Sequence, residues 1–294
     1  MVQYRRLVPS VLSPGTLYIV STPIGNLEDI TYRAVRVLRQ ANLVAAEDTR
    51  RTAKLFAPYG ITTRRVSLHE HNEAKRIPSL LRRLSRGETV AVVSDAGTPL
   101  VSDPGARLVR ATLEAGHRVE AVPGPSAVLA ALAASGLAAD GFTFVGFPPA
   151  RSKDRKLLFS KLALQQRPVV FFEAPHRIRH SLLDLQEIVG DRHIAVCREI
   201  TKRHETLVIG PISSILSKIK EIRGEFTIVV SGGPIAETVV QLPSSTKLTE
   251  EFGQMTAVGL SRREAIRSLA TRYGQSSRTV YQCLEETKVE RYVD

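Results

Sequence analysis

Tryptophan is absent from this 294-residue sequence, and aromatic residues make up only 5% of it. So few rings argue against a β-sandwich and against a surface that stacks unpaired nucleic-acid bases on aromatic side chains. The two cysteines, Cys197 and Cys283, are too few and too far apart for a disulfide framework or a cysteine zinc site. This usage is typical of a reducing compartment, and we expect a cytoplasmic protein.

Long apolar stretches are also lacking. No uninterrupted run reaches the roughly 18 apolar residues of a membrane-spanning helix, so we expect no membrane segment. The start of the chain, MVQYRR, is basic, but the apolar stretch of about 7–15 residues that completes a signal peptide does not follow it. We therefore expect a soluble protein without a signal peptide.

Common nucleotide and metal motifs are missing as well. Neither G-x-x-x-x-G-K-[ST] nor G-x-G-x-x-G occurs, which disfavours an ATPase or a common dinucleotide enzyme. The 7 histidines are scattered except for His69 and His71 around Glu70, and no H-E-x-x-H motif is present. We expect no metal, and we interpret this histidine pair as surface or packing residues.

What the sequence does have is size, apolar content and positive charge. Its length suits two domains, and 43% hydrophobic residues are enough to form their cores. Lys and Arg total 41 against 29 Asp and Glu, so the net charge is +12. A field of this sign attracts polyanions and favours a nucleic-acid partner, although heavy arginine usage across a genome gives the same excess.

Short β-branched runs alternate with helical stretches from residue 15 to residue 232. This alternation predicts an α/β fold with largely parallel sheets. A break at PGPS, residues 123–126, separates an N-terminal α/β domain at 15–123 from a second α/β domain at 124–235, and Ser126 is a good N-cap for the next helix. The predicted strands are 17–21, 89–94, 118–122, 168–172, 193–197, 206–209 and 226–230.

A small helical extension is predicted at residues 247–290, after a linker rich in Pro, Ser and Thr at 241–247. Ser261 and Glu264 form a capping box that opens one helix, and Ser277 can cap a second helix. A helix, a glycine-containing turn and a basic helix are typical of a helix-turn-helix. A simple helical hairpin packed on the second domain has the same pattern, and the residues do not decide between the two.

The densest motif is SDAGTPLVSDPG at residues 94–105, which follows an apolar strand and precedes a helix. In an open α/β sheet this position is the carboxyl edge, where ligands bind. Its glycines and prolines fix an irregular loop whose backbone amides can approach a ligand. Asp95 and Asp103 suit an ammonium group or ribose hydroxyls, but both also suit a structural role as turn caps.

Six further segments accompany this motif: STPIGNL, AEDTR, PGPSA, EAPHR, REITK and GEF, at 21–27, 46–50, 123–127, 173–177, 198–202 and 224–226. In this order they resemble the ribosomal small-subunit RNA 2′-O-ribose methyltransferase I family, a branch of the tetrapyrrole methylase superfamily. The departures are small. Ile200 stands where the family commonly has leucine, and Arg203 and His204 follow the lysine.

The resemblance implies two α/β domains of the tetrapyrrole methylase type, with S-adenosyl-L-methionine in the cleft between them, and a homodimer. It implies 2′-O-methylation of the ribose of a cytidine in the decoding region of 16S ribosomal RNA, with the assembled small ribosomal subunit as the expected substrate. The residues that it implies for cofactor binding are Ser94, Asp95, Gly97, Thr98, Leu100, Ser126, Ala127, Phe172, Phe226 and Thr227.

Methyl transfer to a ribose hydroxyl depends on positioning and on a group that handles the hydroxyl proton. We expect Glu173 or Lys202 to handle the proton and Arg177 to contact phosphate. A salt bridge that holds the domains together is the alternative for each. By motif position, the full set of candidates facing the cleft is Asp103, Glu173, His176, Arg177, Glu199 and Lys202.

Residues 151–179 contain a basic cluster that predicts an RNA-binding surface. Its helical part would look the same as the solvated face of any amphipathic helix. The members of the cluster are Arg151, Lys153, Arg155, Lys156, Lys161, Arg167, Arg177 and Arg179.

Two other functions are compatible with parts of the sequence. Methylation of a tetrapyrrole ring carbon would keep the fold, but it needs no basic exterior, and segments 173–177 and 198–202 fit the RNA branch better. A non-enzymatic nucleic-acid-binding regulator could use the C-terminal helices. That function leaves the cofactor-cleft layout of the upstream segments unexplained.

Overall fold

A computed structural model describes residues 12–138, 140–219, 223–233, 245–257, 259–273 and 276–290. The chain divides into two compact units, Met1–Ser231 and Gly232–Asp294. Within the described ranges, no helix combines the length and the apolar character that crossing a membrane requires. The domain limits 15–123, 124–235 and 247–290 remain predictions.

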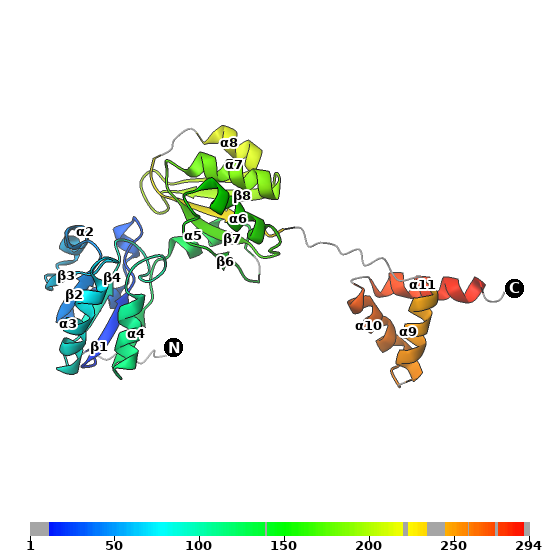
Figure 1. Ribbon diagram of the computed structural model, residues 1–294, viewed down its shortest axis with the longest axis horizontal. Coiled ribbons are helices and arrows are strands. Elements are labelled where there is room, and N and C mark those ends of the chain that lie inside the picture. The colour runs from blue at the N-terminus through cyan, green and yellow to red at the C-terminus, as the bar shows by residue number, and fades with distance from the viewer. Residues whose placement is uncertain are drawn as a thin grey trace, which may run out of the picture. The chain divides into compact units, whose positions relative to one another are not determined.

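The first sheet consists of five parallel strands in the order β3-β2-β4-β1-β5 (Figure 1). Helices α1 and α2 pack on one face, and α3 and α4 pack on the other. The strands are β1 (Thr16–Val20), β2 (Leu43–Ala46), β3 (Arg65–Ser67), β4 (Val90–Val93) and β5 (Arg118–Val122), and the helices are α1 (Tyr32–Gln40), α2 (Thr49–Phe56), α3 (Glu73–Ser85) and α4 (Ala106–Glu114), with short 3-10 turns at Leu27–Asp29 and Ala57–Tyr59.

Burial on both faces explains which strands of this sheet the sequence predicts. All four residues of β4 are buried, with Ala91 and Val93 in one core and Val90 and Val92 in the other, so the strand is an unbroken apolar run. The prediction missed β2 and β3, because β2 is only four residues long and half alanine, and β3 is three residues long.

The second sheet has the order β6-β7-β10-β8-β9 and is mostly antiparallel. Only β6 and β7 run parallel, whereas β10 pairs antiparallel with β7 and β8, and β8 pairs antiparallel with β9. The expectation of largely parallel sheets is therefore wrong for this half, because β8 and β9 follow each other with no crossover helix between them. Its strands are β6 (Thr143–Phe144), β7 (Val169–Glu173), β8 (His193–Arg198), β9 (Thr206–Pro211) and β10 (Phe226–Val230).

Different helices cover the two faces of the second sheet. The larger core lies under α6 (Ser152–Ala163), α7 (Ile178–Val189) and α8 (Ile212–Lys218). The opposite face packs against the short, alanine-rich helix α5 (Ala127–Ala134) through Val128 and Ala131. Since α5 is apolar on every side but buries only these two residues, part of its apolar surface remains exposed.

A buried ion pair joins α6 to α7. Arg155 is 4% exposed, and its guanidinium donates to Asp184 and to the carbonyl oxygens of Pro149 and Ala150. Ser152 donates a hydroxyl hydrogen bond of 2.9 Å to the same carboxylate. The inclusion of Arg155 in an RNA-binding surface is therefore wrong, because this arginine is a core residue.

In its described residues, the second unit has three helices, α9 (Ser245–Ala257), α10 (Arg262–Arg272) and α11 (Ser277–Glu290), around a shared apolar core. The capping box at the start of α10 is confirmed, since Ser261 and Glu264 bond each other's backbone amides. The helix α9 was not predicted and begins within the proposed linker. The second cap is Ser276 and not Ser277, because the Ser276 hydroxyl accepts the Thr279 amide at 3.0 Å.

We expect Asp184→Ala to lower the free energy of unfolding by about 3–5 kcal/mol, because it leaves the Arg155 guanidinium buried without a counter-ion. Chemical denaturation followed by circular dichroism measures this loss. The control is Lys156→Ala on α6, which should cost less than about 1 kcal/mol because its main partner Glu187 is 62% exposed. Equal losses for the two variants would contradict the structural role of the buried pair.

Candidate functional site

The carboxyl ends of three neighbouring strands, β4, β1 and β5, form the base of the site. Thr22, after β1, exchanges two backbone hydrogen bonds of 2.9 and 3.0 Å with Gly97, after β4. The Ser21 hydroxyl donates to Thr98 at 3.1 Å, and the Thr98 hydroxyl donates to the Pro125 carbonyl at 3.1 Å. These bonds hold three loops together at one edge of the sheet, as the 94–105 motif predicted.

The loop at 94–105 has an unusual backbone. Gly97 and Gly105 have φ angles of +80° and +120°, and the non-glycine residues Leu100 and Ser102 have φ angles of 73° and 67°. Any other residue at Gly105 would be strained at this φ angle, and its β-carbon would lie 2.6 Å from Cδ2 of Leu100, which would have to move. Left-handed conformations at non-glycine residues are uncommon and gather at functional sites, where the surrounding contacts hold them.

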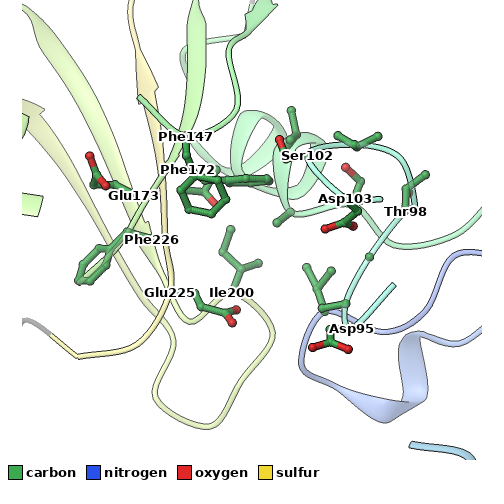
Figure 2. Close-up of a pocket in the computed structure, with 18 of the residues that line it drawn as sticks. Asp95, Thr98, Ser102, Asp103, Phe147, Phe172, Glu173, Ile200, Glu225 and Phe226 are labelled. Carbon is green, nitrogen blue, oxygen red and sulfur yellow. The ribbon is translucent and has the colours of Figure 1, made fainter. Parts of the chain in front are cut away.

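A cavity of about 420 Å³ opens above these loops, between the first sheet and the second. Figure 2 shows Asp95, Thr98, Ser102 and Asp103 on one side, and Phe147, Phe172, Glu173 and Phe226 on the other. The lining residues are Ile24, Glu47, Asp95, Ala96, Gly97, Thr98, Val101, Ser102, Asp103, Ser126, Ala127, Val128, Phe147, Phe172, Glu173, Ala174, Pro175, Ile200, Glu225, Phe226 and Thr227.

The cavity brings together most of the residues predicted to bind a cofactor. Asp95, Gly97, Thr98, Ser126, Ala127, Phe172, Phe226 and Thr227 all line it. Ser94 and Leu100 do not: Ser94 is buried with its hydroxyl donating to the Ala96 carbonyl, and Leu100 packs against the core under α3 and α4. Ser126 occupies the N-cap position of α5, but its side chain makes no capping bond, which leaves the hydroxyl to the cavity.

Three carboxylates lie on the side of the first sheet. Asp103 is half-buried, and burial raises its pKa to about 6 although a hydrogen bond with Ser94 opposes the shift; the negative charges of Glu47 and Asp95 add smaller increases. Burial, followed by the negative charge of Asp95, also raises the pKa of Glu47. Asp95 accepts the Asp48 amide at 3.2 Å and pairs with Arg51 at 2.9 Å, so its carboxylate ties the loop to α2 instead of capping its own turn.

The side of the second sheet is aromatic. Phe172 of β7 meets Phe144 edge to face, with the ring centroids 5.0 Å apart, and lies 5.4 Å from Phe147. Phe147 itself is 56% exposed although it is large and apolar. Ring faces open to a cavity can receive a flat heteroaromatic group. The cavity therefore combines an acidic side with a flat apolar side.

Glu173, one of the residues predicted for catalysis, has its carboxylate fully occupied by neighbours. It pairs with Arg177 at 2.6 Å, accepts the Ala174 amide at 2.7 Å and accepts the Ser181 hydroxyl. Arg177 also donates to the Pro148 carbonyl at 3.3 Å and does not line the cavity. These contacts favour a structural salt bridge for both residues, although this bridge joins the end of β7 to the start of α7 and does not connect the two sheets.

Lys202 is held in a network of its own. Its ammonium group contacts Glu199 at 2.9 Å and Glu225 at 3.0 Å. Burial lowers the pKa of Lys202, but the hydrogen bonds that its ammonium group donates to Glu199 and Glu225 have the larger effect together, so the pKa is raised. A lysine that holds its proton more firmly is a poor proton acceptor at neutral pH. Neither His176 nor Lys202 lines the cavity.

Two glycines allow the loops of the two sheets to meet. A β-carbon on Gly25 would lie 2.4 Å from Cγ of Lys202, and the amide of Asn26 donates to the Thr201 hydroxyl at 3.0 Å. At a second place, a β-carbon on Gly146 would lie 3.0 Å from the Ser102 hydroxyl. The loops bordering the cavity therefore touch across it, at positions where a side chain would push them apart.

Several residues that line this cavity lie outside the set that the sequence predicts for cofactor binding. Glu47 follows β2 at the same sheet edge and lies in the AEDTR segment, so position alone could have found it. Ile24 and Ile200 lie in motifs that were recognised, whereas Phe147 follows the two-residue strand β6, and no pattern marked it. Among the described residues, no three His, Cys, Asp or Glu side chains are placed to hold a metal ion.

Comparison with known proteins agrees with this architecture. The family model described as tetrapyrrole (corrin/porphyrin) methylases matches residues 16–216. The protein named ribosomal RNA small subunit methyltransferase I of Halalkalibacterium halodurans is 40% identical over 270 residues, which cover 91% of this chain and 93% of that protein. The protein of the same name from Synechocystis is 43% identical over 273 residues, covering 91% and 96%.

Solved structures show the same fold at lower identity. The uroporphyrin-III C-methyl transferase of Thermus thermophilus, complexed with S-adenyl homocysteine, is 21% identical, and the match covers 74% of this chain and 97% of that one with a TM-score of 0.54. The methyltransferase CobJ has a TM-score of 0.57 at 20% identity, with coverage of 74% and 94%. The resemblance found in the motifs is confirmed: the chain belongs to the tetrapyrrole (corrin/porphyrin) methylase family, within the group of proteins named ribosomal RNA small subunit methyltransferase I.

Proposed function

We propose that this protein transfers a methyl group from S-adenosyl-L-methionine to the ribose 2′-hydroxyl of a cytidine in the decoding region of 16S ribosomal RNA. The observation that carries the proposal is the cavity, acidic on one side and aromatic on the other, in a chain 40–43% identical to proteins named for methylating small-subunit ribosomal RNA. The net charge of +12 supports a polyanionic substrate.

The residues of the cavity suit this cofactor. S-adenosyl-L-methionine carries an ammonium group and a sulfonium, and Glu47 and Asp103 place negative charge on one side of the cavity. Its adenine is a flat ring that the faces of Phe147 and Phe172 can receive. The volume of about 420 Å³ lies within the range of small-molecule binding sites. The Ser126 side chain makes no capping hydrogen bond to α5, so its hydroxyl can bond the cofactor.

The bound cofactor supplies an electrophilic methyl group on sulfur. We propose that Asp103 accepts the proton of the ribose hydroxyl as the oxygen attacks that methyl carbon, while the electron pair of the carbon–sulfur bond returns to sulfur. Asp103 lines the cavity, is half-buried, and has a pKa of about 6, so it is ionised and basic enough near neutral pH.

The three residues predicted for catalysis receive other roles in this proposal. Glu173 and Arg177 hold the start of α7 (Ile178–Val189) and the aromatic wall in position, because their charged groups pair with each other. Lys202 holds the loop that meets Gly25 across the cavity. All three are positioning residues, and Asp103, the remaining acidic candidate that lines the cavity, is the proton acceptor.

We further propose that the protein works as a homodimer in the cytoplasm on the assembled small ribosomal subunit. An exposed apolar surface supports the dimer. Leu207 and Ile209 of β9 are 41% and 45% exposed, on the face of the sheet that carries Ala195 and Cys197, and Leu129 on α5 is 56% exposed. Apolar surface of this kind is typical of a protein interface.

The direct test is transfer of labelled methyl from S-adenosyl-L-methionine to unmodified small ribosomal subunits, naked 16S RNA and a tetrapyrrole precursor, assayed in parallel. We expect label in the RNA at one alkali-resistant linkage, with faster transfer to the assembled subunit. Label only in the tetrapyrrole precursor would overturn the proposal. Cofactor binding measured by calorimetry in the same preparation shows that the protein is folded.

We expect Asp103→Asn to lower kcat by about 10²–10⁴, the usual contribution of a positioned base, with cofactor affinity changed only a few-fold. In the unmodified protein, kcat/KM should fall as the pH drops through about 6, because protonation removes the acceptor. Glu47→Gln is the matched control, since it removes a charge from the same side of the cavity. Equal losses of kcat in both variants would assign Asp103 a purely electrostatic role.

For the dimer, we expect the double variant Leu207→Glu, Ile209→Glu to convert a species of twice the 32.3 kDa chain mass into a monomer, because charges oppose burial of the strand face. Light scattering after size-exclusion chromatography measures the mass. Leu164→Glu, at the residue that follows α6 and is 88% exposed, should leave the mass unchanged. A monomeric unmodified protein, or a double variant that stays dimeric, would refute this interface.

A further inference from the structure

A second cavity, of about 530 Å³, lies beside the one that holds the proposed cofactor site. We call it the basic pocket. Its lining comes from β8, β9, β10 and α8, together with the loop between β8 and β9: Val196, Arg198, Arg203, His204, Glu205, Thr206, Val208, Lys218, Ile219 and Phe226. Phe226 lines both cavities.

Strand register explains why the two cavities are neighbours. Phe226 pairs with Arg198, and Arg198 pairs with Thr206, so these residues lie at one end of three adjacent strands. The basic pocket opens on the face that carries Val196 and Ile219, under α6–α8, whereas Phe172 of the cofactor cavity packs with the opposite face. A nucleic-acid strand that passes over this end of the sheet would therefore meet both cavities.

The charge of the basic pocket is strongly one-sided. Three of its side chains, Arg203, His204 and Lys218, are exposed, and in the part of the chain that the structure describes none of them has a hydrogen bond or ion pair. The single acid of the lining, Glu205, accepts the Thr201 amide at 3.0 Å. Cations without counter-ions in a concave site attract phosphate.

The predicted basic surface at residues 151–179 contrasts with this pocket. Arg155 is buried against Asp184, Lys156 pairs with Glu187, and Arg179 donates to two backbone carbonyl oxygens near the end of α8. Several cations of that segment therefore already have partners within the protein. Arg203 and Lys218 of the basic pocket have no such partner among the described residues, and Phe226 connects this pocket to the cofactor cavity.

Part of the pocket lining is apolar. Val196 and Ile219 are buried, and the Phe226 ring is almost fully buried beside them. A volume of about 530 Å³ exceeds what a phosphate alone would fill and suits a base with its sugar and phosphate. Single-stranded RNA offers this combination, since its unstacked bases can enter apolar sites while the backbone stays on cations.

We propose that the basic pocket binds a nucleotide of the RNA strand next to the one being methylated, with its phosphodiester on Arg203 and Lys218. This inference rests on the proposed function, because it takes the strand at the cofactor cavity to be RNA. The pocket holds the RNA strand near Phe226, where β10 begins. This contact brings the ribose of the target nucleotide to Asp103.

The test compares the double variant Arg203→Ala, Lys218→Ala with the unmodified protein. The probe is an unstructured, fluorescein-labelled 12-nucleotide RNA, and binding is followed by anisotropy at several salt concentrations. We expect affinity to fall about tenfold and the slope of log K against log salt to fall by about 1.4, at about 0.7 for each lost phosphate contact. Cofactor affinity by calorimetry should not change, and KM for small ribosomal subunits should rise more than kcat falls.

The matched control is Arg107→Ala, Arg110→Ala on α4, which removes the same charge from exposed residues that line neither cavity. The charge-conserving variant Arg203→Lys, Lys218→Arg should restore binding. The proposal would be overturned if the control lost as much RNA affinity as the double variant, or if the salt slope did not change. It would also be overturned if the pocket bound free cytidine monophosphate but contributed nothing to RNA affinity.

These results separate the two proposals. If the unmodified protein methylates RNA and the double variant keeps its KM and salt slope, only the pocket fails. If the unmodified protein transfers no methyl to RNA, the proposed function fails. In that case, loss of RNA affinity in the double variant alone would still support a nucleotide-binding pocket, and unchanged affinity would refute it.

Discussion

Parallel strands of one sheet end at a common edge, and the adjacent strands β4, β1 and β5 therefore bring three loops of the sequence to one line. The exchanged backbone bonds between Thr22 and Gly97, and the hydroxyl chain from Ser21 through Thr98 to Pro125, fix those loops against one another. The acidic side of the cavity stands on this base. If one strand shifted by a residue, its loop would lose these partners and its side chains would face the other core.

Backbone strain marks both sides of the cavity. Leu100 and Ser102 on the first side, and Glu199 and Thr201 on the second, have positive φ angles, each costing about 1–2 kcal/mol. Bonds around the second pair hold it: Glu199 accepts Lys202 and the Glu225 amide, and Thr201 accepts the Asn26 amide. Glu199 and Lys202 thus help to keep a strained loop against the first sheet. They lie in a motif beside the cavity, as catalytic residues would, but they do not line it.

The excess of positive charge is divided unequally between structural and available groups. Arg155, Lys156 and Arg177 are paired with acids near the second sheet, so they add little to the field that an RNA strand would meet. Arg203, His204 and Lys218 have no such partners in the described part of the chain and surround a cavity. Net charge alone predicted a polyanionic partner, but the positions of the counter-ions decide which surface can bind it.

The sequence by itself determined the α/β class, most of the strands, the position of the 94–105 loop at the carboxyl edge of the sheet, and the family, because buried apolar runs and glycine-rich loops leave local patterns. It did not determine the antiparallel pairing of β8 and β9, the short strands β2, β3 and β6, or the place of Phe147 in the cavity. Nor could it separate Asp103 from Glu173, since both line the cavity but the Glu173 carboxylate is held by Arg177 and Ser181. Those outcomes depend on which residues distant in the sequence meet in space, and only the tertiary structure decided that.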